Sequence, residues 1–224
     1  MRLWLRSNSL SVFFGVLFLV SLFGQSLAGH RVFNEDALEH GSQTISYARY
    51  LVSSQFGEAV VENWQSEFLQ FTFFIVATVW LIQRGSNESK KPEDAGRESD
   101  EQQLVGAHAK HTSPRWSKLG GWRTALYSNS LLLVMAAIFF ASWFAQSVTG
   151  WSEYNDAQRD HRQSGVSWAG YLARADFWEK TLQNWQSEFL AVGTMAVFTI
   201  YLRQRGSPES KPVGAPHNQT GVSG

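Results

Sequence analysis

The sequence predicts an all-α integral membrane protein with four transmembrane helices, arranged as two parallel tandem hairpin repeats. Three observations support this fold class: long apolar segments without charge, a repeat at a fixed offset, and no proline inside any apolar segment. The chain has 224 residues, with 19 basic and 19 acidic residues and no cysteine. The lack of cysteine excludes disulfides, thiolate metal sites and a cysteine nucleophile, and the neutral charge argues against a nucleic-acid partner.

Two long segments carry no charged residue, at 7–29 and 124–152. Each is as long as a membrane-spanning helix, which needs about 20 apolar residues. A shorter apolar segment follows each of them, at 68–83 and 189–202. At about 1.5 Å per residue, the shorter segments reach only about 21–24 Å, less than the roughly 30 Å of a bilayer core. We therefore expect the second and fourth helices to begin earlier and to take polar residues into the membrane.

The first apolar segment also has features of a signal peptide. Arg2 and Arg6 precede it, and Ser26-Leu27-Ala28 resembles a cleavage site. We favour a retained helix because the third apolar segment is its internal copy, and an internal segment has no such cleavage role. The sequence alone leaves cleavage of the first segment open.

The second half of the chain repeats the first at an offset of 121 residues. The motif Asn-Trp-Gln-Ser-Glu-Phe-Leu at 63–69 returns at 184–190, and about 37 of 89 aligned positions are identical without a gap. Such a periodicity identifies an internal duplication. Because each copy has two predicted spans, both copies enter the membrane in the same direction, as in a parallel repeat.

The repeat divides the chain into four predicted parts. They are a first two-span repeat (1–84), a polar flexible cytoplasmic linker (85–121), a second two-span repeat (122–205) and a disordered cytoplasmic tail (206–224). Basic residues in short loops favour the cytoplasmic side. The N-terminus, linker region and tail hold 2, 8 and 3 Lys and Arg, against 2 and 4 in the loops within the repeats. We therefore expect both termini in the cytoplasm.

The loops within the repeats contain a further predicted element. Ser46 is followed by Tyr-Ala-Arg-Tyr-Leu, and Ser167 by Trp-Ala-Gly-Tyr-Leu. Serine is a favoured N-cap and aromatic residues favour the membrane interface, so we predict two short capped helices. At the opposite end of each repeat, an arginine followed by a glycine (84–85 and 205–206) predicts the end of the second and fourth helices.

The repeated motif places polar residues near the outer end of the second and fourth helices. A second helix long enough to cross the bilayer begins near Asn63. Four residues there follow the spacing of one helical face, which we expect to point into the bundle: Asn63, Ser66, Glu67 and Gln70. Gln25 lies about 25 Å along the first helix, at a similar depth. The candidate intramembrane polar layer is therefore Gln25, Asn63, Glu67, Gln146, Asn184 and Glu188.

Two interpretations of this layer stay open. Ionisable residues inside membrane spans are candidates for ion, proton or small-solute handling, here through Glu67 and Glu188. Alternatively, the layer only holds helices together by hydrogen bonds, and the outer loops or the linker bind a partner, as in a structural or accessory protein. The lipid bilayer is the expected partner, no nucleic acid is expected, and a homo-oligomer or a membrane partner stays open.

No residues point to an enzyme. The chain has no phosphate-binding loop, nucleophile elbow or zinc-protease signature, so we predict no catalytic residue, no metal ligand and no cofactor. His40 and His161 correspond between the repeats and each follows an acidic residue, which leaves a metal site as a minor alternative to exposed loop residues.

The chain resembles an uncharacterised family of bacterial multi-span membrane proteins, a domain of unknown function, in the repeated motif and in the flanking segments 29–31 and 83–86. The resemblance covers both repeats, roughly 2–90 and 123–211, and not the linker or the tail. It implies a bacterial inner membrane and no activity. The second copy has Trp151 and Ser152 in place of His30 and Arg31, so a role of those two residues would not be duplicated.

Overall fold

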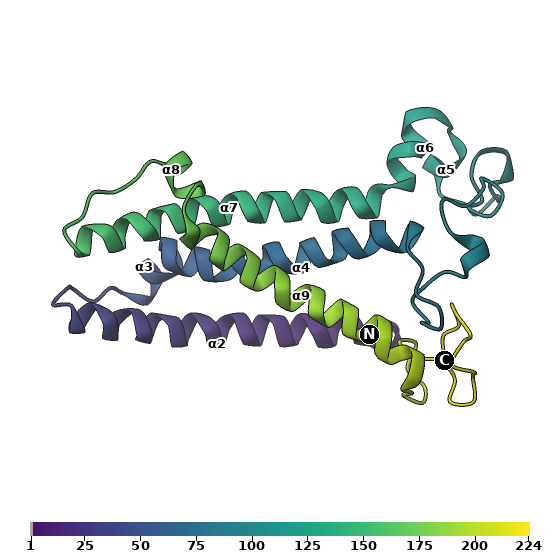
Figure 1. Ribbon diagram of the computed structural model, residues 1–224, viewed down its shortest axis with the longest axis horizontal. Helices are drawn as coiled ribbons and strands as arrows, with labels where there is room; N and C mark the ends of the chain where they lie inside the picture. Colours follow the sequence, from purple (N-terminus) through teal and green to yellow (C-terminus); the bar gives the residue numbers. More distant parts are fainter. Residues whose placement is uncertain (1) are drawn as a thin grey trace. The chain divides into compact units, whose positions relative to one another are not determined.

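The computed structural model describes residues 2–224, and within these residues it is all-α, without a β-strand (Figure 1). The predicted all-α class is therefore confirmed. Met1, which belongs to the predicted first repeat, lies outside the described residues. The chain forms two compact units. The first unit contains the residues up to Val60 together with Val148–Val166, and the second unit contains Val61–Ser147 and Ser167–Gly224.

The helices recur at the repeat offset. Each bound in the first half differs from its counterpart by 121 residues: α2 (Ser9–Glu39) and α7 (Ser130–Asp160), α3 (Tyr47–Leu51) and α8 (Trp168–Leu172), α4 (Ser54–Trp80) and α9 (Ala175–Tyr201). The shorter helices are α1 (Arg2–Ser7), α5 (Arg115–Lys118) and α6 (Gly121–Ser128), with 3₁₀ turns η1 (Pro92–Asp94) and η2 (Gly106–His108).

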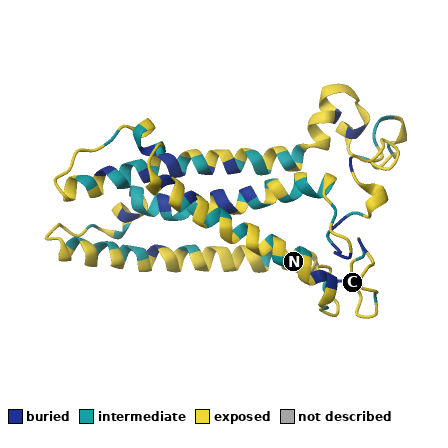
Figure 2. Cartoon of the chain, in the orientation of Figure 1, coloured by how far each residue is buried: buried dark blue, intermediate teal, exposed yellow. Residues whose placement is uncertain are grey.

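α2 and α7 are long and apolar enough to cross a membrane. Each has 31 residues and is about 46 Å long. Within the most apolar 18-residue window, only 6% of residues are buried in α2 and 22% in α7, as the mostly yellow and teal helices of Figure 2 illustrate. A long apolar core helix of a water-soluble protein would be mostly buried. The two helices therefore suggest a membrane protein.

The two short loop helices are capped as predicted. The Ser46 hydroxyl accepts a hydrogen bond from the Arg49 amide at 3.4 Å, and the Ser167 hydroxyl accepts one from the Gly170 amide at 3.1 Å. Both serines have the extended backbone of an N-cap. The prediction of short capped helices at these two positions is confirmed.

α4 and α9 end earlier than the Arg-Gly pairs predicted, at Trp80 and Tyr201. The amides of Gln83 and Gln204, which a longer helix would pair internally, donate instead to the hydroxyls of Ser89 and Ser210, both at 2.9 Å. The glycines at 85 and 206 do adopt positive φ, +90° and +80°, but in turns beyond the helices. Local side-chain bonds thus compete with helix continuation at both repeat ends.

Candidate functional site

The repeated motif joins α4 to α9 in the second unit. We call the three side-chain hydrogen bonds that cross between these helices the polar seam: Asn184 Nδ2 to Glu62 Oε1 at 2.7 Å, Trp185 Nε1 to Gln65 Oε1 at 2.8 Å, and Ser66 Oγ to Glu188 Oε1 at 3.4 Å. The rings of Phe73 and Phe189 continue the contact edge to face, with centroids 6.0 Å apart. Two consecutive turns of each helix are therefore bonded by polar groups.

The face of α4 that turns inward includes Ser66 of the predicted face, but not Asn63 or Glu67. Gln65, Ser66 and Leu69 are buried, whereas Asn63 and Glu67 are exposed. Gln65 and Ser66 are the residues that bond α9, and Leu69 lies one turn further along the same face. Compared with the prediction, α4 is rotated about its axis, because the hydrogen-bond partners of the Trp185 indole and the Glu188 carboxylate both lie on this face.

The six residues of the candidate polar layer lie in different environments. Asn184 and Glu188 are half-buried in the polar seam, where their partners are Glu62 and Ser66. Gln146 is buried in α7 of the second unit. Gln25 belongs to the first unit, where its side chain donates to the Ala59 carbonyl at 3.4 Å. A single layer of all six residues stays a prediction.

Sequence reasoning missed the residues that complete the polar seam. Glu62 lies just outside the repeated motif, and its counterpart in the second copy is Gln183, so the repeat gave no signal for it. Gln65 and Trp185 lie inside the motif and are identical in both copies. That these two residues are identical in both copies was the available signal. Helical spacing alone instead placed the neighbouring residues Asn63 and Glu67 on the inward face.

An asparagine near the C-terminal end of α2, and another near that of α7, hold the backbone that leads to the next short helix. The Asn155 side chain accepts from the Val166 amide at 2.8 Å and donates to the Val166 carbonyl at 3.1 Å. Asn34 makes the same pair with Ile45, also at 2.8 and 3.1 Å. The asparagine is identical in the two repeats, so both copies hold the loop before the short helix in the same way.

The exchange of His30 for Trp151 preserves a contact. His30 Nε2 donates to the Ile45 carbonyl, and Trp151 Nε1 donates to the Val166 carbonyl, both at 2.7 Å. Trp151 therefore duplicates this bond of His30, because both rings present an N–H at the same place. That a functional role of His30 and Arg31 would not be duplicated stays a prediction. His40 lies 3.3 Å from the Asp36 carboxylate, and no cluster of three or more metal-ligating side chains occurs within residues 2–224.

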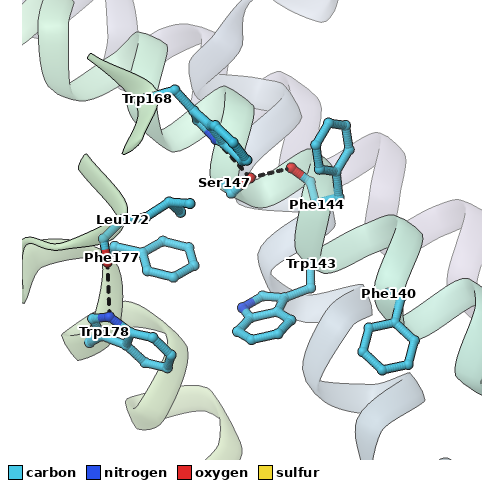
Figure 3. A pocket seen from close by; sticks show the side chains of 8 residues that line it. All are labelled: Phe140, Trp143, Phe144, Ser147, Trp168, Leu172, Phe177 and Trp178. Carbon is cyan, nitrogen blue, oxygen red and sulfur yellow. Dashed lines mark hydrogen bonds between the residues drawn. The ribbon is translucent and has the colours of Figure 1, made fainter. Parts of the chain in front are cut away.

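An aromatic cavity of about 310 Å³ lies in the second unit between α7, α8 and α9 (Figure 3). Three of its tryptophans, Trp143, Trp168 and Trp178, stand where the first repeat has leucine, tyrosine and glycine. Trp168 donates to the Ser147 hydroxyl at 3.1 Å and Trp178 to the Leu172 carbonyl at 3.0 Å. Among the described residues, the buried indole N–H of Trp143 has no hydrogen-bond partner. The lining suits an apolar ligand.

The ends of the two repeats meet in the second unit, in what we call the tail clasp. Lys211, nearly fully buried, donates to the carbonyls of Gly85 at 2.6 Å and His217 at 2.9 Å, and to those of Pro216 and Gln219, both at 3.2 Å. The Gly85 amide donates to the Thr220 hydroxyl at 2.8 Å, and the Gly221 amide to the Ser86 carbonyl at 3.0 Å. The predicted flexibility of the linker and disorder of the tail stay predictions.

Two titratable groups in or beside the tail clasp have shifted pKa values. Burial lowers the pKa of the Lys211 ammonium, and the nearby Arg203 lowers it further. Burial raises the pKa of the Glu88 carboxyl, and a hydrogen bond and repulsion from Glu209 raise it further. Glu88 and Glu209 are repeat counterparts. The Glu88 carboxyl therefore keeps its proton to a higher pH than an isolated glutamate does.

Comparison with known proteins identifies one family. A family model described as a domain of unknown function, DUF6766, matches residues 1–222. The match extends beyond the two repeats over the linker and nearly all of the tail, and its description names no activity. No curated protein and no solved structure matches the chain. The predicted resemblance to a family with a domain of unknown function is confirmed, and the chain belongs to the DUF6766 family.

Proposed function

We propose that the chain is a four-span protein of the bacterial inner membrane, with both termini in the cytoplasm. The exposure of α2 and α7 supports membrane insertion, because large apolar surfaces are rarely left in water. α4 and α9 supply the other two spans. Each has 27 residues, about 40 Å, and ends in the interfacial aromatic residue Trp80 or Tyr201.

Single cysteines test this topology, since the chain has no cysteine of its own. We expect a membrane-impermeant maleimide to label Ser42→Cys, in the first outer loop, on intact cells. Ala95→Cys, in the linker, should react only after the membrane is opened, and both variants should stay in the membrane pellet after alkaline carbonate washing. Unchanged chain provides the blank. Labelling of Ala95→Cys on intact cells would overturn the orientation, and release by carbonate would overturn membrane insertion.

We further propose a structural role for the repeated motif, which ties the second helices of the two repeats into one bundle. The polar seam carries this proposal, because its three bonds all join α4 to α9. Interhelical hydrogen bonds of this kind associate helices where no hydrophobic effect separates protein from lipid. A double-variant cycle across Gln65 and Trp185 tests the role. Breaking the pair should destabilise the bundle, and removing both polar groups should restore most of the loss.

Proton handling is the second candidate, and Glu188 favours it. Its carboxylate is half-buried, is held by one long bond from Ser66, and experiences the charge of Glu67. A carboxylate so placed in a membrane protein is a candidate for proton or ion transfer.

Proton flux into liposomes distinguishes proton handling by Glu188 from a purely structural role of this residue. A pH-sensitive dye reports flux under an imposed potential for wild type, Glu188→Gln and Glu67→Gln. Glutamine keeps an oxygen for the Ser66 bond, so Glu188→Gln should retain thermal stability and lose the flux. The exposed Glu67→Gln is the matched control and should retain most of it. If the wild type conducts no protons, proton handling is eliminated and the structural role remains.

A further inference from the structure

The second half of the linker, together with the residues that join it to α7, carries a local positive charge in a chain that is neutral overall. Between Glu101 and Glu153 there is no acidic residue. The part before α7 contains four basic residues and two histidines: His108, Lys110, His111, Arg115, Lys118 and Arg123. By contrast, residues 93–101 contain five acidic residues and one arginine. The linker is therefore divided into an acidic part and a basic part, and the basic part adjoins α7.

The basic part folds into a helical hairpin formed by α5 and α6. Thr124 Oγ1 donates to the Trp116 carbonyl at 2.7 Å and ties the two helices together. Lys118 Nζ donates to the His111 carbonyl at 2.6 Å and holds the preceding segment against α5. Ser117 and Thr124 are buried and form the inner face of the hairpin. The hairpin therefore has a defined outer face.

Large apolar side chains occupy the outer face of this hairpin. Trp122 is 69% exposed, and four others are between 41% and 43% exposed: Trp116, Leu119, Leu126 and Tyr127. The Arg123 guanidinium lies 5.5 Å from the centre of the Trp122 ring, so cation and aromatic ring form one surface. A basic amphipathic helix with exposed tryptophan and leucine is typical of segments that lie in the membrane interface.

A polar cavity of about 380 Å³ opens beside this face, at the junction of the linker, the hairpin and the start of α7. Five of its lining residues carry hydroxyl groups: Ser113, Ser117, Tyr127, Ser128 and Ser130. Hydroxyl groups can exchange hydrogen bonds with the phosphate and glycerol oxygens of a lipid headgroup. Because Ser130 is the first residue of α7, the cavity lies at the end of a candidate span.

We propose that the α5–α6 hairpin binds anionic phospholipid headgroups at the membrane surface where α7 begins. The basic side chains attract the anionic surface, the outer apolar residues insert among the headgroups, and the hydroxyl-lined cavity receives a headgroup. This inference rests on the proposed membrane insertion of α7. It adds a lipid class, since a neutral surface would not use the basic side chains.

Fluorescence of the full-length chain in liposomes tests the lipid preference. Leu119→Cys, labelled with an environment-sensitive dye, reports on the outer face. Ala95→Cys, in the acidic part of the linker, is the matched control. We expect the Leu119 probe to shift to the blue in vesicles of phosphatidylcholine with phosphatidylglycerol, relative to phosphatidylcholine alone, and the Ala95 probe to stay unchanged. High salt should reverse the shift, because it screens exposed charges.

Removing the basic side chains should remove the preference. Each basic residue near an anionic surface contributes about 1 kcal/mol, or roughly fivefold in the binding equilibrium. Arg115→Gln, Lys118→Gln and Arg123→Gln together should therefore weaken hairpin binding by about a hundredfold. Equal emission in both vesicle types, or a triple variant that keeps the shift, would overturn the proposal.

Two further outcomes separate the sources of failure. A shift caused by free glycerol phosphate in phosphatidylcholine vesicles would assign the site to a soluble anion and overturn binding to a lipid surface. Failure of the chain to float with vesicles of either composition would overturn the proposed membrane protein itself, and the lipid inference with it. Flotation with both compositions and no spectral difference would overturn the lipid inference alone.

Discussion

Replacing Lys211 with methionine should release the C-terminal tail from the end of the first repeat. The Lys211 ammonium lies among four backbone carbonyls, and a methionine side chain leaves all four without this donor. Hydrogen bonds that involve a charged group contribute about 1.5–3 kcal/mol each. Losing the equivalent of two of them corresponds to about 3 kcal/mol, or a local opening equilibrium roughly a hundredfold larger.

Hydrogen exchange measures this release at two amides that the tail clasp protects. The Gly85 amide is bonded to Thr220 and the Gly221 amide to Ser86, so peptides that cover 83–89 and 212–222 should both lose protection in Lys211→Met. Lys90→Met is the matched control, because Lys90 is the repeat counterpart of Lys211. Its ammonium donates to the Gly96 carbonyl at 3.1 Å and pairs with the Glu98 carboxylate at 3.0 Å.

The control should change little, because a partly exposed ion pair is worth only about 0–1 kcal/mol. Rapid exchange of both peptides already in the wild type would contradict the clasp and support the disordered tail that the sequence predicts. If exchange is slow in the wild type and in Lys90→Met but fast in Lys211→Met, the buried Lys211 ammonium is what keeps this end of the chain ordered.

The sequence predicts the local elements of this chain well, because their causes are local. Uncharged segments determine α2 and α7, and the serine just before each loop helix determines its cap. The repeat supports these predictions, since a pattern seen twice at the same offset is hard to attribute to chance. Helix ends were predicted less well, because the hydroxyls of Ser89 and Ser210 compete for amides several residues away.

The candidate site was harder to predict because it depends on which way a polar helix faces. All residues from 62 to 67 of α4 are polar except Trp64. Two neighbouring faces of the helix therefore fit the spacing of a polar face equally well. The choice between them is made by partners on α9, more than 100 residues away. The tail clasp has the same origin, since Lys211 and Gly85 are 126 residues apart and no local pattern joins them.

Breaking the pair of Gln65 and Trp185 should destabilise the bundle more than removing the pair altogether. Gln65 is fully buried. Within residues 2–224, its Oε1 accepts a hydrogen bond from the Trp185 indole and its Nε2 has no hydrogen-bond partner. Trp185→Phe therefore leaves the buried side-chain amide of Gln65 without a hydrogen bond at either its oxygen or its nitrogen. Gln65→Leu leaves the indole N–H without an acceptor. An unsatisfied buried polar group costs about 1–3 kcal/mol.

In Gln65→Leu with Trp185→Phe, neither orphaned group remains, so the double variant should recover more than half of the summed loss. Thermal unfolding in one detergent at fixed pH measures all four proteins, and the cycle isolates the pairwise free energy. Interhelical bonds in membrane proteins give about 0.6 kcal/mol on average and up to about 1.7 kcal/mol. We expect the upper part of this range, because Gln65 is excluded from both water and lipid.

The repeat supplies the matched control for this cycle. Gln186 and Trp64 are the counterparts of Gln65 and Trp185, and both are exposed. Gln186→Leu with Trp64→Phe should therefore show a coupling near zero, although the residue types are identical. Equal coupling in both cycles would mean that the motif acts through its composition at the membrane surface. Coupling confined to Gln65 and Trp185 would mean that the duplicated motif has become asymmetric, with one copy's glutamine and the other copy's tryptophan joining the two halves.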